Sequence, residues 1–103
     1  MEGEAVNAAL REHLLAFSGV AERPSRFGSG SAFFRGAREF AHFHSATQID
    51  LRLTRKVIAT FAADSRLVKR RGASDWIAFN VVVPLDVLVA RALATLAHDR
   101  AGS

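Results

Sequence analysis

Two histidines and an aspartate are the residues of this sequence whose types and spacing most readily support chemistry. His42 and His44 lie two residues apart in REFAHFHSATQIDLRL (residues 38–53), and Asp50 follows six residues after His44. Two imidazoles and one carboxylate form a usable ligand set for a divalent metal ion. Alternatively, Asp50 could orient His42 as a general base, with His44 as a second hydrogen-bond donor. A third interpretation is the polar face of a sheet with one cross-strand charge pair.

These three residues meet only if the segment that carries them is a β-hairpin. Apolar and polar residues alternate in 38–45 and in 48–53, which is the period expected of strands. A turn at 45–47 then fixes the register of the two strands. The facing pairs would be His42 with Asp50, His44 with Gln48, and Phe40 with Arg52, all on one face of the sheet.

The rest of the chain predicts an α+β fold that would hold this hairpin. The expected elements are a helix at 4–18, a loop at 22–31, strands at 32–35, 38–45 and 48–53, a helix at 55–64, a strand at 67–71, a turn at 72–74, a strand at 75–83 and a helix from Pro84. The order α-β-β-β-α-β-β-α implies a mostly antiparallel sheet with helices packed on one face. We expect a single domain of residues 1–103, with a core from about 4 to 98 and an exposed second sheet face.

The composition excludes several classes of function. The 103 residues include no cysteine, so disulfides, thiolate metal ligands and cysteine nucleophiles are absent. The chain begins with an acidic segment rather than a basic signal-peptide region, and no apolar run approaches the roughly 20 residues of a membrane span. We therefore expect a cytoplasmic protein without a membrane partner. Hydrophobic residues make up 50% of the chain, and a homodimer would cover surplus apolar surface.

The basic charge of the chain raises nucleic-acid binding as an alternative. The net charge is +4 and the sequence pI is about 11.0. Most of the twelve arginines and two lysines are scattered, and only RLVKRR (residues 66–71) forms a cluster. That cluster is also typical of a charged edge strand, which discourages sheet-to-sheet aggregation.

Four motifs follow one another in a fixed order along most of the chain. They are RFG at 26–28, GAREFAHFH at 36–44, the Asp50–Leu51 pair, and SDWIAF at 74–79. Their order and spacing resemble those of small bacterial proteins called luciferase-family or luciferase-domain proteins, over about residues 23–97. The resemblance implies a compact α+β domain without implying a reaction. It marks as matched positions Arg26, His42, His44, Asp50 and Trp76. Departures from the family pattern are Ser45, Ala46, Arg52 and Asp75.

The first functional hypothesis is a binding domain that uses the sheet face around His42, His44 and Asp50. Arg26, Arg52 and Trp76 would edge this face and help it bind a small anionic or planar ligand, or a protein partner. The alternative is a metal-dependent or histidine-based enzyme on the same face, and a divalent metal is the one cofactor that these residues suggest. A second alternative is nucleic-acid binding through residues 66–71.

Overall fold

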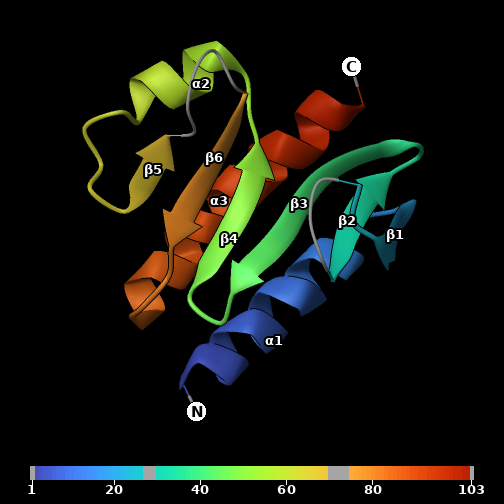
Figure 1. Cartoon of the computed structure of the whole chain (residues 1–103), viewed down its shortest axis with the longest axis horizontal. Coiled ribbons are helices and arrows are strands. Elements are labelled where there is room, and N and C mark those ends of the chain that lie inside the picture. The colour runs from blue at the N-terminus through green and yellow to red at the C-terminus, as the bar shows by residue number, and fades with distance from the viewer. Residues whose placement is uncertain (1, 27–29, 70–74, 103) are drawn as a thin grey trace.

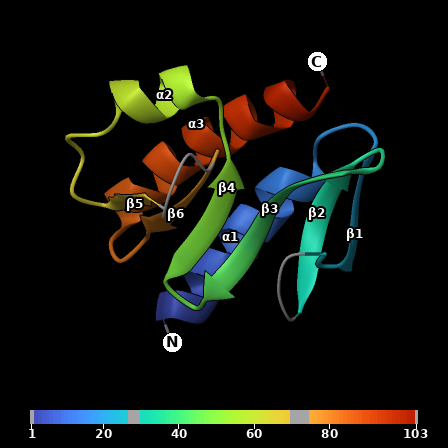
Figure 2. The same cartoon turned by 45° about the horizontal axis from the view of Figure 1, so that its top comes forward.

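The computed structural model describes residues 2–26, 30–69 and 75–102, and it confirms the α+β class. The elements are α1 (Glu2–Leu15), β1 (Val20–Pro24), β2 (Ser31–Arg35), β3 (Arg38–Ser45), β4 (Gln48–Arg52), α2 (Arg55–Thr60), β5 (Leu67–Lys69), β6 (Trp76–Asn80) and α3 (Pro84–Ala101). The strands form one six-stranded sheet in the order β1-β2-β3-β4-β6-β5, and every neighbouring pair is antiparallel. Figures 1 and 2 show α1 and α3 together on one face of this sheet. We call the opposite sheet face the open face.

The strand β1 corrects the sequence prediction of a loop at 22–31. Val20–Pro24 pairs with β2, with Pro24 facing Ser31. Proline and serine make this segment read as a loop, yet proline is tolerated in an edge strand because such a strand pairs on one side only. The predicted order therefore lacked one strand at the edge of the sheet.

Several element ends also differ from the predictions. The last strand was expected to reach residue 83, but β6 ends at Asn80. The amides of Val82 and Val83 donate instead to the Asp86 carboxylate, at 2.9 and 3.1 Å, and so cap the start of α3. The helix expected at 55–64 ends at Thr60. Residues 70–71 of the predicted strand and the predicted turn at 72–74 lie outside the described residues.

The hydrophobic core lies between the sheet and the two long helices. Its largest fully buried side chains include Phe33, Phe40, Ile49, Leu51, Ile77 and Phe79 from the strands, and Leu10, Leu14 and Leu93 from the helices. The α3 residues that face the core are mostly alanines, such as Ala90, Ala94 and Ala97. Short side chains let α3 approach the sheet closely, and this leaves β3 and β4 firmly held from behind.

A β-bulge at Phe40 changes which side chains of β3 face the helices. Phe33 pairs with Ala41 but Phe34 pairs with Glu39, so Phe40 is the extra residue. Phe40 and Ala41 both enter the core, and the Phe40 ring lies 5.6 Å from the ring of His98 on α3. The prediction that Phe40 shares a face with His42 is therefore wrong. Glu39 instead lies on the open face, beside Phe34.

A second irregularity in β3 falls at His44. Ala41, His42 and Phe43 pair with β4 in the predicted register, so His42 faces Asp50 as expected. After Phe43 the register shifts, and Ser45 faces Gln48. The predicted pairing of His44 with Gln48 is therefore wrong, because His44 is the extra residue of this second bulge.

Candidate functional site

Glu39, His42 and Asp50 form a hydrogen-bonded chain on the open face, which we call the buried triad. His42 Nδ1 lies 2.9 Å from Glu39 Oε2, and His42 Nε2 lies 2.7 Å from Asp50 Oδ2. The second contact follows from the strand register, because His42 and Asp50 are directly opposite each other. The first depends on the bulge at Phe40, which turns Glu39 to the same face. One imidazole thus uses both ring nitrogens on two carboxylates.

The triad is buried, whereas the sequence analysis expected these groups on an exposed face. Glu39 and Asp50 are each 3% exposed and His42 is 9% exposed. Neither long helix lies on this side of the sheet (Figure 2), but Ser25 and the Arg26 amide contact Glu39, and the Trp76 ring lies 5.1 Å from the His42 ring. Burying three ionisable groups is costly unless they satisfy one another, and the two short contacts at His42 meet that need.

The protonation of His42 reflects two opposing effects. Burial by itself would lower the pKa of the imidazole, because the charged form loses its water. The hydrogen bonds and negative charges of Asp50 and Glu39 outweigh this effect, so the pKa of His42 is raised above its ordinary value. Both ring nitrogens of His42 face carboxylate oxygens, so neither is free to accept a proton from a substrate.

Glu39 also ties the triad to the residues that follow β1. Its Oε2 accepts a hydrogen bond from Ser25 Oγ at 2.8 Å, and its Oε1 accepts one from the Arg26 backbone amide at 2.7 Å. A carboxylate that accepts backbone and hydroxyl donors holds them in place. The prediction placed the Arg26 side chain in the site, but the Arg26 contact with the triad is made by its amide.

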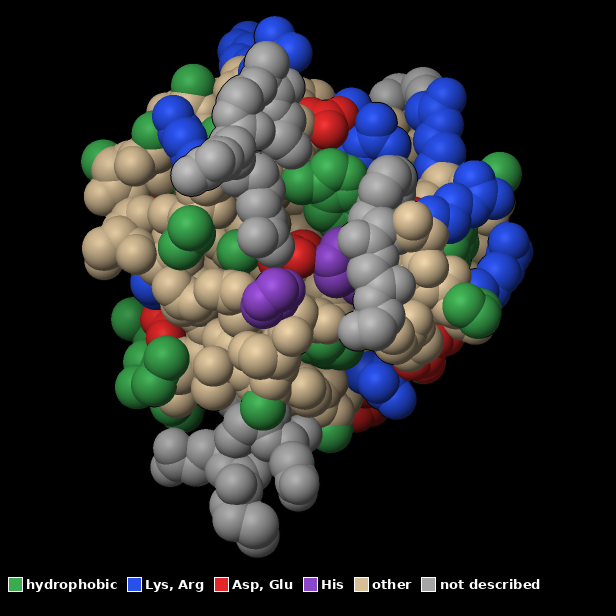
Figure 3. Space-filling view, viewed as in Figure 1, with side chains coloured by type: hydrophobic (Ala, Val, Ile, Leu, Met, Phe, Trp, Pro, Cys, Tyr) green, Lys and Arg blue, Asp and Glu red, His purple; other side chains and the backbone are tan. Residues whose placement is uncertain are grey.

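His44 is the accessible member of the site. Its side chain is 55% exposed, and its Nδ1 lies 3.8 Å from Asp50 Oδ2. Asp50 Oδ2 therefore has a close partner in His42 and a more distant one in His44. Figure 3 shows two histidine side chains on either side of an acidic side chain near the middle of the open face. Asp50 thus connects the buried triad to solvent through His44.

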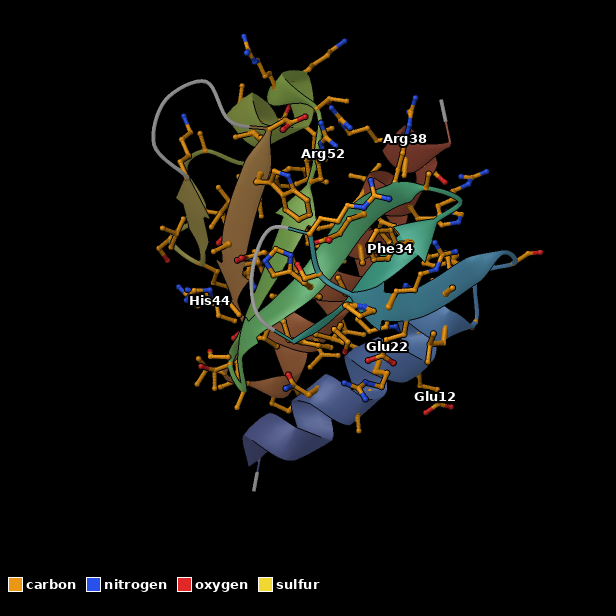
Figure 4. All side chains as sticks on the ribbon, turned by 45° about the vertical axis from the view of Figure 1, so that its right-hand side comes forward. Glu12, Glu22, Phe34, Arg38, His44 and Arg52 are labelled. Atoms are coloured by element: carbon orange, nitrogen blue, oxygen red, sulfur yellow. The ribbon has the colours of Figure 1, made fainter. Side chains whose placement is uncertain are left out.

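Trp76 and Arg52 lie at the other end of the site from His44. The Trp76 ring is half-buried and lies 5.1 Å from the His42 ring, tilted by 39°. Arg52 faces Trp76 across β4 and β6, but its guanidinium Nε contacts Asp75 Oδ2 at 3.0 Å. Figure 4 shows Arg52, on β4, and His44, on β3, well apart from each other.

Asp75 holds two arginines from distant parts of the chain. It contacts Arg52 on β4 and Arg100 near the end of α3. Burial alone would raise the pKa of Asp75, but its bond to Arg52 and the charges of both arginines lower it. Arg52 therefore shares one carboxylate with Arg100, and its predicted role in holding a ligand stays a prediction.

The sequence analysis brought together four residues that the fold does place side by side, and it missed one. His42, His44, Asp50 and Trp76 cluster on the open face. Glu39 was missed because simple alternation assigns it to the opposite face. The available signal was the adjacent apolar pair at positions 40 and 41, which breaks the alternation of the strand.

The metal and nucleic-acid alternatives find less support in the geometry. Within residues 2–26, 30–69 and 75–102, no group of three or more His, Asp or Glu side chains is arranged to hold a metal ion. The set His42, His44 and Asp50 stays a prediction. Arg66 of the basic cluster is paired with Asp64 and Asp86, at 2.6 and 3.1 Å. The last two arginines of the cluster lie outside the described residues.

Two further predictions concern partners of the whole chain. No helix in the part of the chain that the structure describes is long and apolar enough to cross a membrane. Exposed apolar side chains gather where β6 leads into α3, namely Val82, Val83, Leu85 and Leu88. The homodimer stays a prediction that light scattering of the purified chain can test.

Comparison with known proteins gives one match. A family model described as "Luciferase domain" matches residues 37–97, which is more than half of the chain. The matched range contains His42, His44, Asp50 and Trp76, and also Glu39, but begins after Arg26. No curated protein and no solved structure matches the sequence.

Proposed function

The chain belongs to the luciferase-domain family. For this member we propose that the open face binds a small planar organic ligand. The ligand would lie against Trp76 and make a polar contact with His44, which lies beside the buried Asp50. The observation that carries this proposal is the buried triad of Glu39, His42 and Asp50, on a sheet face with neither long helix over it.

The energetic cost of the triad supports a functional role. An apolar trio of similar volume is often as stable as a buried ionic cluster, or more stable. Ionisable groups with perturbed pKa values are also enriched at functional sites. A chain that needed only a second layer of packing over its sheet would be expected to use apolar side chains there.

The side chains around the buried triad indicate the kind of ligand. Trp76 offers part of an aromatic ring, against which a planar molecule can pack at an offset or edge-on. His44 is exposed and can donate or accept a hydrogen bond at its free side. Asp50 is buried and held in one orientation by His42, so it acts on a bound ligand through its neighbour His44. A planar ligand with hydrogen-bonding substituents therefore fits this face better than a purely apolar one.

A ligand screen with matched variants tests this proposal. We would screen planar organic compounds by thermal shift, and map each hit by amide chemical shifts in ¹⁵N-labelled protein. Hits should perturb the amides around His44, Asp50 and Trp76, and His44→Ala and Trp76→Leu should each weaken binding by about tenfold, or 1.4 kcal/mol. Glu12→Gln is the control, because Glu12 is exposed on α1, which covers the other face of the sheet. The proposal fails if hits bind equally well to His44→Ala and Trp76→Leu, or if no compound binds.

A second candidate function is acid–base chemistry at His44. The observation that favours it is an exposed imidazole whose Nδ1 lies 3.8 Å from a buried aspartate, an arrangement that can orient a histidine toward a substrate. His42 is a poor candidate for the same role because both of its ring nitrogens face carboxylates. Incubating a bound ligand with the protein and following its mass would separate the two functions. Turnover that His44→Gln abolishes without loss of binding would indicate an enzyme.

A further inference from the structure

Two arginines lie over one phenylalanine ring at the β1 side of the open face. Arg23 Cζ is 5.3 Å and Arg26 Cζ is 5.7 Å from the centroid of the Phe34 ring. Phe34 lies on β2 (Figure 4) and is buried, whereas both arginines are exposed. Each distance lies within the range of a cation–π contact. Two guanidinium groups therefore converge on one small area of surface.

The fold fixes the backbone under both arginines. Arg23 belongs to β1 and faces Ala32 of β2. Arg26 follows β1, and its amide donates to the Glu39 carboxylate at 2.7 Å. Glu39 in turn is part of the buried triad and faces Phe34 across β2 and β3. The triad, the ring and the two arginines are thus connected by contacts between neighbouring strands.

Neither guanidinium has an internal counter-ion in the described part of the chain. Other arginines of this protein do: Arg11 pairs with Glu22, Arg52 with Asp75, and Arg66 with Asp64. Arg23 and Arg26 form no such ion pair with a described carboxylate. Two like charges side by side repel, and an anion bound between them would remove that repulsion. The planar guanidinium fork suits carboxylate and phosphate oxygens.

We propose that Arg23 and Arg26, whose guanidinium groups lie over the Phe34 ring, form an anion subsite that binds a carboxylate or phosphate group of the ligand on the open face. This inference rests on the proposed function and specifies the ligand class. Arg23, Ala32, His42 and Asp50 stand in one row across four neighbouring strands. Strands lie about 4.8 Å apart, so Arg23 and Asp50 are separated by roughly 14 Å along that row. The ligand would be elongated, with its anionic group at one end and its planar part toward Trp76.

Titrations with simple anions test the subsite directly. The probes are inorganic phosphate, benzoate and the uncharged benzamide, each added to ¹⁵N-labelled protein at constant ionic strength. Phosphate or benzoate should shift the amide signals of Arg23, Arg26 and Phe34, whereas benzamide should not. The double variant Arg23→Gln/Arg26→Gln should bind the anion at least tenfold more weakly. Stronger binding of benzoate points to a carboxylate ligand, and stronger binding of phosphate points to a phosphate ester.

A control variant separates binding at this subsite from non-specific attraction by positive charge. A comparison of binding at the arginines with binding near Trp76 separates the subsite from the proposed function. Lys69→Gln removes one exposed positive charge from the opposite edge of the sheet, and it should leave anion binding within about twofold of the parent chain. Equal weakening in Lys69→Gln, or no anion-induced shift at Arg23 and Arg26, overturns the subsite. A hit at Trp76 and His44 whose affinity is unchanged in the double variant overturns the subsite and keeps the proposed function. Anion binding at the arginines, with no planar compound bound near Trp76, keeps the subsite and overturns the proposed function.

Discussion

Raising the pH above neutrality should destabilise the fold through His42. The pKa of this imidazole is raised in the folded chain, because the contacts to Asp50 and Glu39 outweigh the effect of burial. A histidine with a raised folded-state pKa binds its proton more tightly in the folded state than in the unfolded state. Its contribution to the free energy of unfolding is complete below the unfolded pKa, near 6.5, and is lost as the pH rises through the folded pKa.

The size of the effect is bounded by one proton. The free energy of unfolding should fall by at most about 1.4 kcal/mol per pH unit above pH 6.5, and should level off above the folded pKa of His42. His13 contributes nothing in this range. Its pKa is lowered by burial and by the charge of Arg91, so its effect makes stability rise with pH and ends near pH 6.5. The decline above that pH should therefore report on His42.

Urea unfolding at a series of pH values between about 6 and 9 measures this decline. The fluorescence of Trp76, the single tryptophan of the sequence, follows unfolding. Glu39→Gln should reduce the slope, because it removes one of the two carboxylates that raise the pKa of His42. His42→Gln should abolish the slope and lower stability by about 3–5 kcal/mol, since two buried carboxylates lose their shared partner. A free energy of unfolding that stays constant above pH 6.5 would refute the reasoning. A free energy of unfolding that declines with pH as steeply in Glu39→Gln as in the parent chain would also refute it.

Three further predictions concern other parts of the chain. Asp75→Asn should lower the free energy of unfolding by about 1–2 kcal/mol, measured by urea unfolding, because two arginines lose a charged acceptor. Zinc should raise the melting temperature of the parent chain no more than that of His44→Ala, because both ring nitrogens of His42 already face carboxylates. A zinc-induced rise in melting temperature in the parent chain alone would establish the metal site. Thr54→Ala should lower the free energy of unfolding by about 1 kcal/mol in the same assay, because the Thr54 hydroxyl accepts a hydrogen bond from the Val57 amide at 3.2 Å. An unchanged free energy of unfolding would show that this helix cap does not stabilise the fold.

The parts of the fold that the sequence predicts are those governed by regular periodicity. Alternation in residues 38–45 and 48–53, together with the short turn between them, was enough to place His42 opposite Asp50. The helix start at Pro84 was also correct, because proline suits the first turn of a helix. Both features depend only on residues close together in the chain.

The missed features depend on backbone irregularities and on distant partners. The bulges at Phe40 and His44 each shift the facing pattern by one residue, and alternation alone cannot locate them. Glu39 joins His42 only because of the first bulge. The burial of the site and the pairing of Asp75 with Arg100 depend on segments that come together only in the folded chain. Sequence periodicity therefore identifies the two central strands of the site but not its third titratable group.

The position of the bulge relative to the triad connects the fold to the proposed function. Without the extra residue at Phe40, Glu39 would face the core, where a carboxylate has no partner and a high cost of burial. With it, the same backbone distortion sends Phe40 into the core and brings Glu39 to His42. Bulges are enriched next to functional sites because they re-aim side chains in this way. This distortion assembles the buried ionic group on which the proposed ligand binding rests, and the second bulge, at His44, lies beside it.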